Sequence, residues 1–323
     1  MKKILLTGCC GFIGSRVGEI LLERGFSVAG IDEMNEYYDV RLKEWRLAHL
    51  TKYKNFSFIR QDISSPELKN VVRDFSPDAI INLAARAGVR ASIKDPFIYF
   101  KANLEGTLNL LEIAKTLNIK NFILASSSSV YAGEKMPFNE DLPVNKPISP
   151  YAASKKSAEG LCYTYHYLYG IDMTIFRYFT VYGPAGRPDM SVFKFIKMID
   201  EGIPLKIYGD GNQKRDFTYV DDIAEGTIRG LKITGFNIIN LGGNHPYSIN
   251  ELISFIEKEL GKKAVIEYKS FEKTDLVATW ADIQKAKDLL DWQPLTGLPE
   301  GIKKTVQWYK ENKHWLKNIK LVD

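Results

Sequence analysis

Short hydrophobic runs alternate with longer amphipathic stretches over the first 125 residues of the chain. The runs are rich in β-branched residues and predict buried strands at residues 4–7, 27–32, 56–62, 79–85 and 122–126. Between them, residues 14–24 and 102–117 repeat their apolar positions with the spacing of a helix. Because these strands are apolar along their length, the alternation predicts a parallel, doubly wound α/β sheet covered by helices on both faces.

The pattern becomes less regular after a loop that contains Pro137, Pro143, Pro147 and Pro150. The later periodicity predicts helices over residues 151–169, 191–202, 250–260 and 299–310, and strands over 173–179 and 265–268. These segments predict a smaller mixed α/β portion. We therefore expect a first domain of residues 1–180, to which a segment of about 216–242 returns, and an interleaved second domain of residues 181–323.

The composition is that of an ordinary globular protein, with 45% hydrophobic and 26% charged residues among 323. The N-terminus becomes polar and glycine-rich too early for a secretory signal, and no apolar run reaches roughly 18 residues, so we expect a cytoplasmic protein without a membrane anchor. The net charge of +5 is scattered among acidic residues. Scattered charge of this kind is typical of an ordinary solvated surface and offers little support for nucleic-acid binding. A mildly basic surface would also suit a polyanionic small substrate.

Cysteine and histidine usage gives no indication of a disulfide framework or a metal site. The three cysteines are Cys9, Cys10 and Cys162, and the four histidines show no short metal-ligand spacing. We therefore expect no metal.

A glycine-rich turn lies between the first predicted strand and the first predicted helix. Its sequence is Thr7-Gly8-Cys9-Cys10-Gly11-Phe12-Ile13-Gly14. Glycines at this spacing let the backbone turn tightly, approach a diphosphate closely and direct N–H groups at its charge. The turn therefore predicts a dinucleotide site, although a glycine-rich turn of this kind also serves plain packing.

Two acids at predicted strand ends refine the cofactor prediction. Asp32 ends the second strand, where a carboxylate accepts both hydroxyls of the adenosine ribose and repels a 2′-phosphate, so NAD is preferred over NADP. Asp62 and Ile63 end the third strand and are candidates to meet the adenine. An acid at a strand end is also a common helix cap, and that alternative stays open for Asp62.

The sequence Ser149-Pro150-Tyr151-Ala152-Ala153-Ser154-Lys155 is the strongest indication of chemistry. Helical spacing puts Tyr151 and Lys155 on one face, where the ammonium, helped by a positive nicotinamide, lowers the pKa of the phenol from its usual value near 10. The tyrosine then serves as a general acid/base. Alone, this pair is a common surface feature, but the fifth strand ends near Ser127, whose hydroxyl would lie beside the tyrosine.

From Lys3 to about Trp292 the chain resembles the extended short-chain dehydrogenase/reductase family. The first domain of that family has the Rossmann-type fold. Within that family the chain is most similar to the UDP-glucuronate 4-epimerases. The matching segments are residues 82–90 (NLAARAGVR), 149–155 (SPYAASK), 177–190 (RYFTVYGPAGRPDM), 208–211 (YGDG) and 215–222 (RDFTYVDD). Two residues depart from the family pattern: Cys9-Cys10 replaces a small Gly-Ala pair, and Asn82 stands where the family often has His.

The resemblance implies a catalytic triad of Ser127, Tyr151 and Lys155. It implies NAD contacts from Gly8, Gly11, Phe12, Ile13, Gly14, Asp32, Lys43, Asp62, Ile63, Leu83, Ala84, Ala85, Asn103, Tyr151, Lys155 and Tyr178. For a UDP-sugar it implies contacts from Gly88, Val89, Arg90, Ser127, Ser128, Ser129, Thr180, Arg187, Tyr208, Arg215 and Asp275. Arg90 and Arg187 are otherwise ordinary surface charges, and Asp275 is equally well explained as a surface acid.

The residues after Ser127 indicate which sugar is bound. Related dehydratases have Asp-Glu there and related uronate decarboxylases have Glu, whereas this chain has Ser128 and Ser129. With Thr180, these hydroxyls are neutral donors suited to a sugar carboxylate. The alternative is that Ser128 and Ser129 only satisfy local backbone groups.

We therefore expect an NAD-dependent 4-epimerase that interconverts UDP-glucuronate and UDP-galacturonate through transient oxidation at C4. UDP-glucose 4-epimerase and UDP-glucuronate decarboxylase remain alternatives, as does a non-catalytic NAD-binding sensor on the same fold. The family also implies a homodimer. The aromatic helix face around Tyr163 and Tyr167 is either its surface or part of the core.

Overall fold

The computed structural model describes residues 2–270 and 277–321, and within them it has a central parallel sheet of seven strands. The strand order is β10-β6-β5-β4-β1-β2-β3, and all neighbours run parallel. The strands are β1 (Lys3–Thr7), β2 (Ser27–Asp32), β3 (Phe56–Arg60), β4 (Ala79–Asn82), β5 (Asn121–Ser127), β6 (Asp172–Tyr178) and β10 (Phe236–Leu241). The predicted Rossmann-type doubly wound sheet is confirmed, and β1 and β4 mark the point where its order reverses.

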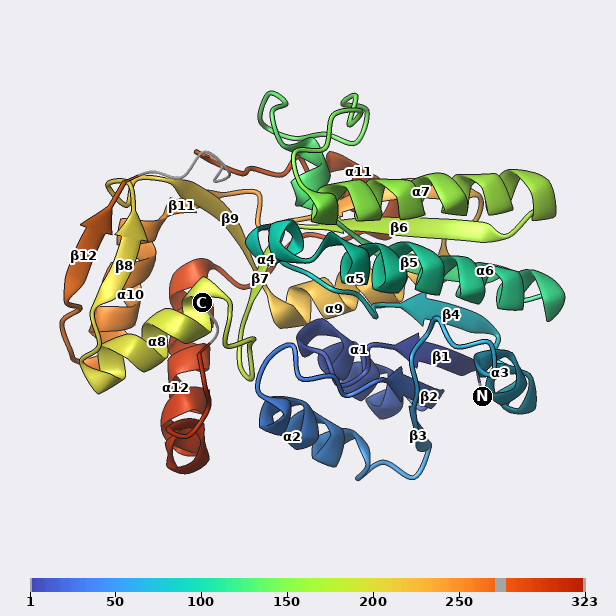
Figure 1. Cartoon of the computed structure of the whole chain (residues 1–323), viewed down its shortest axis with the longest axis horizontal. Helices are drawn as coiled ribbons and strands as arrows, with labels where there is room; N and C mark the ends of the chain where they lie inside the picture. The colour runs from blue at the N-terminus through green and yellow to red at the C-terminus, as the bar shows by residue number, and fades with distance from the viewer. Residues whose placement is uncertain (1, 271–276, 322–323) are drawn as a thin grey trace.

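Helices cover both faces of this sheet because successive strand residues point to opposite sides (Figure 1). Ile4 and Leu6 pack against one layer of helices, whereas Leu5 packs against the other. The first layer comprises α1 (Phe12–Glu23), α9 (Val220–Arg229) and α11 (Gln284–Leu290). The second comprises α3 (Leu68–Phe75), α6 (Gly106–Thr116) and α7 (Pro150–Tyr169).

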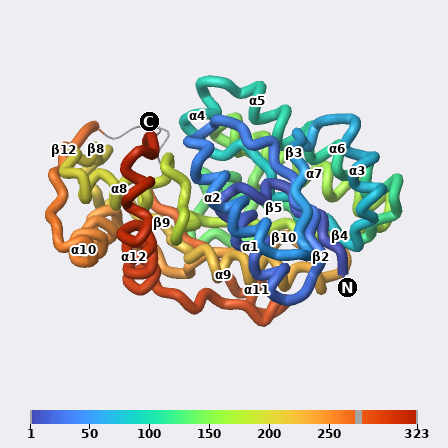
Figure 2. The backbone as a smooth tube through the Cα atoms, turned by 90° about the horizontal axis from the view of Figure 1, so that it is seen from below, coloured from blue at the N-terminus to red at the C-terminus, as the bar shows by residue number. Residues whose placement is uncertain are grey.

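A smaller layer of mixed structure lies beside the large sheet, at the left of Figure 1. Its strands are β7 (Thr180–Tyr182), β9 (Lys214–Tyr219) and β11 (Pro246–Ser248) in one sheet, and β8 (Leu205–Tyr208) with β12 (Ile266–Lys269) in another. Its helices are α8 (Ser191–Glu201), α10 (Ile249–Leu260) and α12 (Leu298–Leu316), which share a separate hydrophobic core. Figure 2 shows α12 between α10 and α2 (Val40–Leu50), and Trp45 of α2 meets Trp308 edge-on.

The chain passes between the two layers more than once. β9 pairs with β7 in the smaller layer, but α9 follows at once and packs on α1, and β10 then pairs with β6 in the large sheet. The segment that returns to the large sheet therefore begins after β9, a few residues later than the sequence suggests.

Several elements of the structure are shorter than the apolar runs that predict them. The runs at 56–62 and 79–85 continue past the ends of β3 and β4, and their last residues line a cleft. The run at 102–117 is split into a π-helix (Lys101–Glu105) and α6, and it follows the short helices α4 (Val89–Lys94) and α5 (Pro96–Phe100). Within the described ranges, every helix is too short or too polar to span a lipid bilayer.

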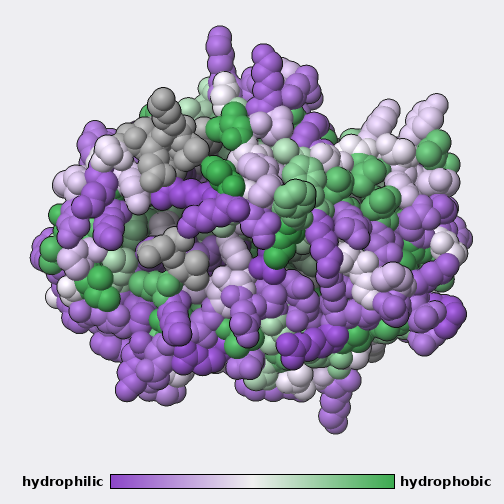
Figure 3. Space-filling model, viewed as in Figure 1, coloured by the Kyte–Doolittle hydropathy of each residue, from purple (hydrophilic) through white to green (hydrophobic). Residues whose placement is uncertain are grey.

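The outer surface near α5 and α7 carries exposed hydrophobic side chains. Phe97 of α5 is 86% exposed, and Figure 3 shows hydrophobic side chains gathered over this helix. Tyr163 and Tyr167 of α7 are 54% and 76% exposed, so neither belongs to the core. The homodimer stays a prediction.

Candidate active site

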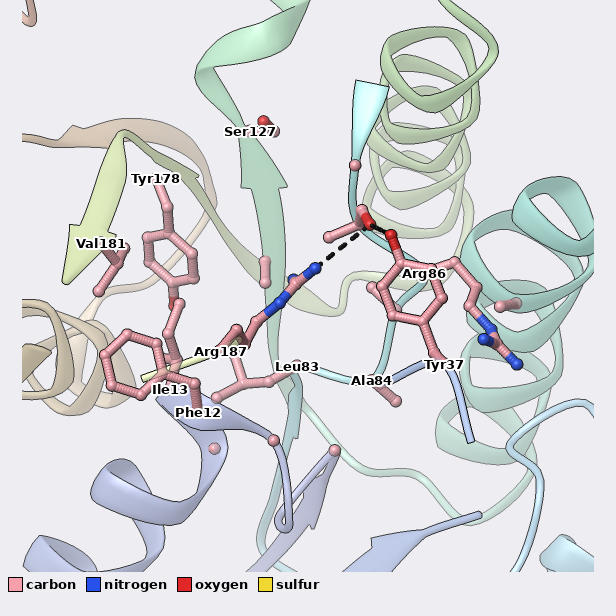
Figure 4. Close-up of a pocket in the computed structure, with 18 of the residues that line it drawn as sticks. Phe12, Ile13, Tyr37, Leu83, Ala84, Arg86, Ser127, Tyr178, Val181 and Arg187 are labelled. Atoms are coloured by element: carbon pink, nitrogen blue, oxygen red, sulfur yellow. Dashed lines mark hydrogen bonds between the residues drawn. The ribbon is translucent and has the colours of Figure 1, made fainter. Parts of the chain in front are cut away.

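A cleft lies at the carboxyl ends of β1, β4, β5 and β6, next to the point where the strand order reverses. Its volume is about 330 Å³. In Figure 4, Phe12 and Ile13 border one side, Leu83 and Ala84 come from the end of β4, and Ser127 lies at the end of β5. Arg187 extends into the space between them, toward Tyr37.

The cleft brings together most of the residues that the sequence singled out. Lining residues among them are Gly8, Gly11, Phe12, Ile13, Gly14, Asp32, Lys43, Asp62, Ile63, Leu83, Ala84, Ala85, Gly88, Ser127, Ser128, Ser129, Tyr151, Lys155, Tyr178, Thr180 and Arg187. Other candidates are placed elsewhere in the described structure: Asn103, Val89, Arg90, Tyr208 and Arg215 do not line this cleft. Asp275 lies outside the described residues.

The glycine turn between β1 and α1 tolerates no larger side chains at its key positions. A Cβ at Gly14 would collide with the carbonyl oxygen of Gly8, and one at Gly8 would lie 2.7 Å from the Ala84 nitrogen. Gly8 also has a φ of +68°, which favours glycine. The turn therefore keeps its backbone N–H groups close to the cleft, where α1 begins.

Asp32 is 8% exposed and is held at the edge of the cleft by two backbone donors. The N–H groups of Cys10 and Met34 donate to its two carboxylate oxygens, at 3.1 and 2.9 Å. Lys43, from α2, reaches the same end of the cleft and donates to the Asn35 carbonyl at 2.8 Å. Burial lowers the pKa of Lys43.

The two departures from the family pattern have structural explanations. The side chains of Cys9 and Cys10 are fully buried behind the glycine turn and do not line the cleft. Cys9 fits because residue 30 is glycine: a Cβ there would lie 2.7 Å from the Cys9 sulfur. Asn82 accepts from Thr7 at 2.7 Å and donates to Thr107 at 3.1 Å, and it thereby links β1 to α6.

Tyr151 and Lys155 lie in the first turns of α7 and face the end of β5. The helix starts here because Pro150 occupies its first turn and the Ser149 hydroxyl accepts from the Ala152 N–H at 3.2 Å. Lys155 is buried and donates to the Ala125 carbonyl at 2.7 Å. Burial lowers the pKa of Lys155 to about 8, although the Glu159 carboxylate acts in the opposite direction.

The pKa of Tyr151 differs from the sequence-based expectation. Burial raises the pKa of Tyr151 above its usual value, and the opposing effects come from a hydrogen bond with Ser127 and the positive charge of Arg187. Lys155 is not among the causes. The groups of the chain itself therefore leave the pKa of Tyr151 raised, and the lowering expected from the sequence includes the charge of a positive nicotinamide.

A buried ion pair fixes the strand that carries Ser127 against α7. Arg177 of β6 donates to both oxygens of Glu159, at 2.9 and 2.8 Å, and both side chains are 1% exposed. The Ser126 hydroxyl donates to the same carboxylate at 2.6 Å. Because Glu159 is one turn beyond Lys155 on α7, these bonds set the position of β5 relative to Tyr151 and Lys155.

The carbonyl oxygen of Ala87 collects three donors at the far end of the cleft. The hydroxyls of Tyr37 and Tyr99 donate to it at 2.7 and 3.3 Å, and Arg187 donates at 3.4 Å (Figure 4). The Tyr99 ring also meets the Tyr151 ring edge-on. Sequence reasoning missed Tyr37 and Tyr99 because the segments before α2 and α6 carry no regular apolar pattern.

Three of the implied contact residues interact with other parts of the protein in the described structure. Asn103 accepts from the Arg86 N–H at 2.8 Å and donates to its carbonyl at 3.0 Å, so it shapes the loop after β4. Arg90 stacks on the Tyr208 ring at 4.5 Å. Two residues that the resemblance implies as UDP-sugar contacts are therefore neighbours, and both lie outside the lining of the cleft.

Comparison with known proteins identifies the family to which this chain belongs. The family model described as GDP-mannose 4,6 dehydratase matches residues 5–305. The chain belongs to the extended short-chain dehydrogenase/reductase family.

Individual members of this short-chain dehydrogenase/reductase family are similar over nearly the whole chain. The UDP-glucuronate 4-epimerase of Thermodesulfobacterium geofontis is 57% identical and covers 99% of this chain and 100% of its own length. The crystal structure of the UDP-glucuronic acid 4-epimerase of Bacillus cereus with UDP-glucuronic acid and NAD has a TM-score of 0.90 at 40% identity, covering 96% and 99% of the two chains. The UDP-glucose 4-epimerase of Thermotoga maritima with UDP-glucose has a TM-score of 0.88 at 30% identity, covering 96% and 99%.

Proposed function

We propose that this chain is an NAD-dependent 4-epimerase that interconverts UDP-glucuronate and UDP-galacturonate. The observation that carries the proposal is the group of side chains at the end of β5. Tyr151, Lys155 and Ser127 meet there, and the neutral Ser128 and Ser129 line the same cleft where related dehydratases and decarboxylases have acids. The relatives named above support the same substrate.

The cleft fits the cofactor at its adenosine and diphosphate end. The crowded glycines at 8 and 14 leave backbone, not side chains, facing the space where a diphosphate would lie. Asp32 would accept the hydroxyls of the adenosine ribose and repel a 2′-phosphate, which favours NAD. Ile63 and Asp62, which also line the cleft, would meet the adenine.

The residues at the end of β5 would transfer the proton of the sugar 4-hydroxyl. NAD supplies hydride acceptance and return at C4. Tyr151 would take the proton of the 4-hydroxyl, and Ser127 would relay or polarise it. Arg187 already opposes the effect of burial on the Tyr151 pKa, and a positive nicotinamide together with Lys155 would favour the ionised phenol further.

Epimerisation requires the oxidised sugar to present its opposite face before hydride returns to C4. For a uronate the oxidised intermediate is unstable, because a 4-keto uronate is a β-keto acid that can lose carbon dioxide. Loss of carbon dioxide requires the bond to the carboxylate carbon to align with the π orbitals of the ketone. We propose that Ser128, Ser129 and Thr180 hold the carboxylate in an orientation that prevents this alignment. The neutral hydroxyls bind the group without adding an acid or base beside it.

The nucleotide end would be bound by the smaller layer. We propose that residues 181–323, except for the parts that return to the large sheet with α9, β10 and α11, form the substrate domain. Tyr208 with its neighbour Arg90, together with Arg215, would receive the UDP group. The role of Asp275 and the cytoplasmic location stay predictions.

The alternatives differ in product. A UDP-glucose 4-epimerase would prefer the neutral hexose, and a decarboxylase would release a pentose product. A non-catalytic NAD-binding sensor would do neither, and it would not need Ser127, Tyr151 and Lys155 together. Incubation with UDP-glucuronate, UDP-glucose and UDP-xylose, with products identified by NMR, tests the proposal. We expect UDP-galacturonate from UDP-glucuronate and far slower turnover of UDP-glucose, whereas equal turnover of UDP-glucose would remove the uronate assignment.

Removing one carboxylate donor should weaken catalysis and open the side reaction. We expect Thr180→Ala or Ser129→Ala to cost about 1 to 3 kcal/mol for the unpaired charged acceptor, which is roughly a tenfold to hundredfold loss of kcat/KM. The decarboxylated fraction should rise because a mobile carboxylate samples the aligned geometry more often. Ser157→Ala, an exposed serine on α7, is the control. Unchanged kcat/KM and product ratio in both site variants would contradict this role.

A further inference from the structure

Arg46 of α2 is a buried arginine in the wall that separates the glycine turn from the smaller layer. The residue is 1% exposed. Its Nη1 donates to the Cys10 carbonyl at 3.0 Å and to the Tyr38 hydroxyl at 2.7 Å. Its Nε and Nη2 donate to the Ala185 carbonyl at 3.1 and 2.7 Å, and Nη2 also reaches the Gly186 carbonyl at 3.3 Å.

These partners are uncharged, which is unusual for a buried cation. Within residues 2–270 and 277–321, no carboxylate forms an ion pair with Arg46, whereas the buried Arg177 has Glu159 and the largely buried Arg187 has Asp189. Buried charges are normally paired because their desolvation is costly. The positive charge of Arg46 lies directly behind the carbonyl of Cys10, in the turn that would receive an anionic diphosphate.

Arg46 also holds a strained segment on the substrate side. Ala185 has a φ of +52°, a left-handed conformation that a residue with a Cβ rarely adopts. The two donors on its carbonyl, with the third contact to Gly186, fix this conformation. Arg187 follows immediately, extends into the cleft and lies near enough to Tyr151 to affect its pKa.

We propose that Arg46 is a positioning residue that couples the dinucleotide half of the cleft to the sugar half. One edge of its guanidinium orients the glycine turn and complements the charge of the diphosphate, while the other holds the 185–186 backbone so that Arg187 faces the sugar. A rigid link of this kind makes the two affinities depend on each other, and the dependence is reciprocal. The sugar part of the inference rests on the proposed function.

Two substitutions separate the charge of Arg46 from its geometry. Arg46→Gln removes both, so the purified enzyme should lose bound NAD at least tenfold faster, and its KM for UDP-glucuronate should rise at least tenfold. Arg46→Lys keeps the charge but has a single nitrogen, so it cannot reproduce the bonds that Nε, Nη1 and Nη2 make to the two segments. It should retain NAD nearly as wild type does and still show the raised KM, with a smaller change in kcat.

The matched control is Arg229→Gln. Arg229 also bridges backbone carbonyls between segments, those of Leu290 and Asp291, but at a distance from the cleft, in the contact between α9 and the end of α11. It should lower thermal stability without changing NAD retention or KM. Each variant is compared by thermal unfolding, NAD release and steady-state kinetics at a temperature where it is folded.

The coupling itself is measured from NAD release with and without a nucleotide on the substrate side. UDP-glucuronate should slow NAD loss from the wild type and should lose this effect in Arg46→Gln. UDP serves as a second probe, so that failure of the wild type to epimerise UDP-glucuronate overturns the proposed function without removing this test. A wild-type KM in folded Arg46→Lys would overturn the bridging role. Wild-type NAD retention in folded Arg46→Gln would overturn the role toward the diphosphate.

Discussion

Replacing Tyr151 with phenylalanine is expected to lower the turnover of UDP-glucuronate at least about a hundredfold, the usual scale for a lost general base. Tyr151 is buried at the end of β5, where Ser127 and the positive charge of Arg187 oppose the effect of burial on its pKa. The substitution removes one hydroxyl without changing the ring that packs edge-on against Tyr99. Folding and NAD content should therefore survive, and the loss should appear in kcat.

The control for this substitution lies on the same helix. Tyr163 of α7 is 54% exposed and packs against Phe236, away from the cleft. Tyr163→Phe should leave turnover unchanged. The comparison is made by steady-state kinetics on protein whose NAD content has been measured after denaturation. Near-normal turnover of Tyr151→Phe would show that another group moves the C4 proton.

Replacing Gly14 with alanine should remove most of the bound dinucleotide. The wild-type protein is expected to carry NAD through purification because the reaction reduces and reoxidises it on each turnover. A Cβ at Gly14 would collide with the Gly8 carbonyl, which is backbone and cannot swing aside. Overpacking costs about 1 to 3 kcal/mol, and a clash against backbone belongs at the upper end, so affinity for NAD should fall roughly a hundredfold.

Gly160→Ala is the matched control for this glycine. Gly160 lies inside α7, and a Cβ there would meet nothing within 4 Å. Alanine should be neutral or slightly stabilising there because it is the better helix former. Both variants are denatured and the released dinucleotide is quantified. Full NAD content in Gly14→Ala would contradict the assignment of the glycine turn to the diphosphate.

The apolar pattern could predict the large sheet because its strands are buried on both faces and its covering helices have regular stripes. It could not predict α2 in the same way. This helix turns Lys43 and Arg46 inward, toward the cleft and the glycine turn, so two of its four buried positions are polar and the apolar periodicity is weakened. A surface helix and a helix that places charges in a site look alike in such a sequence.

The candidate site was predictable where its residues share one local segment. Gly8 to Gly14 and Tyr151 to Lys155 lie within single turns or helices, so their spacing carries the geometry. Tyr37, Tyr99 and Arg187 meet at the Ala87 carbonyl from three distant segments. Such contacts depend on the tertiary fold, and the spacing of residues within one segment cannot predict them. The direction of the Lys155 side chain likewise depends on the tertiary fold, because it is set by Ala125 of β5.

The most direct test of the account uses UDP-glucuronate that carries deuterium at C4, with the products followed by NMR. If C4 is oxidised and the same hydride returns to the opposite face, UDP-galacturonate should form with the deuterium still at C4, and little pentose should appear. Loss of the deuterium to solvent would contradict transient oxidation by a retained cofactor. A main product that lacks C6 would identify a decarboxylase, and unchanged substrate in the presence of NAD-loaded protein would contradict the epimerase itself.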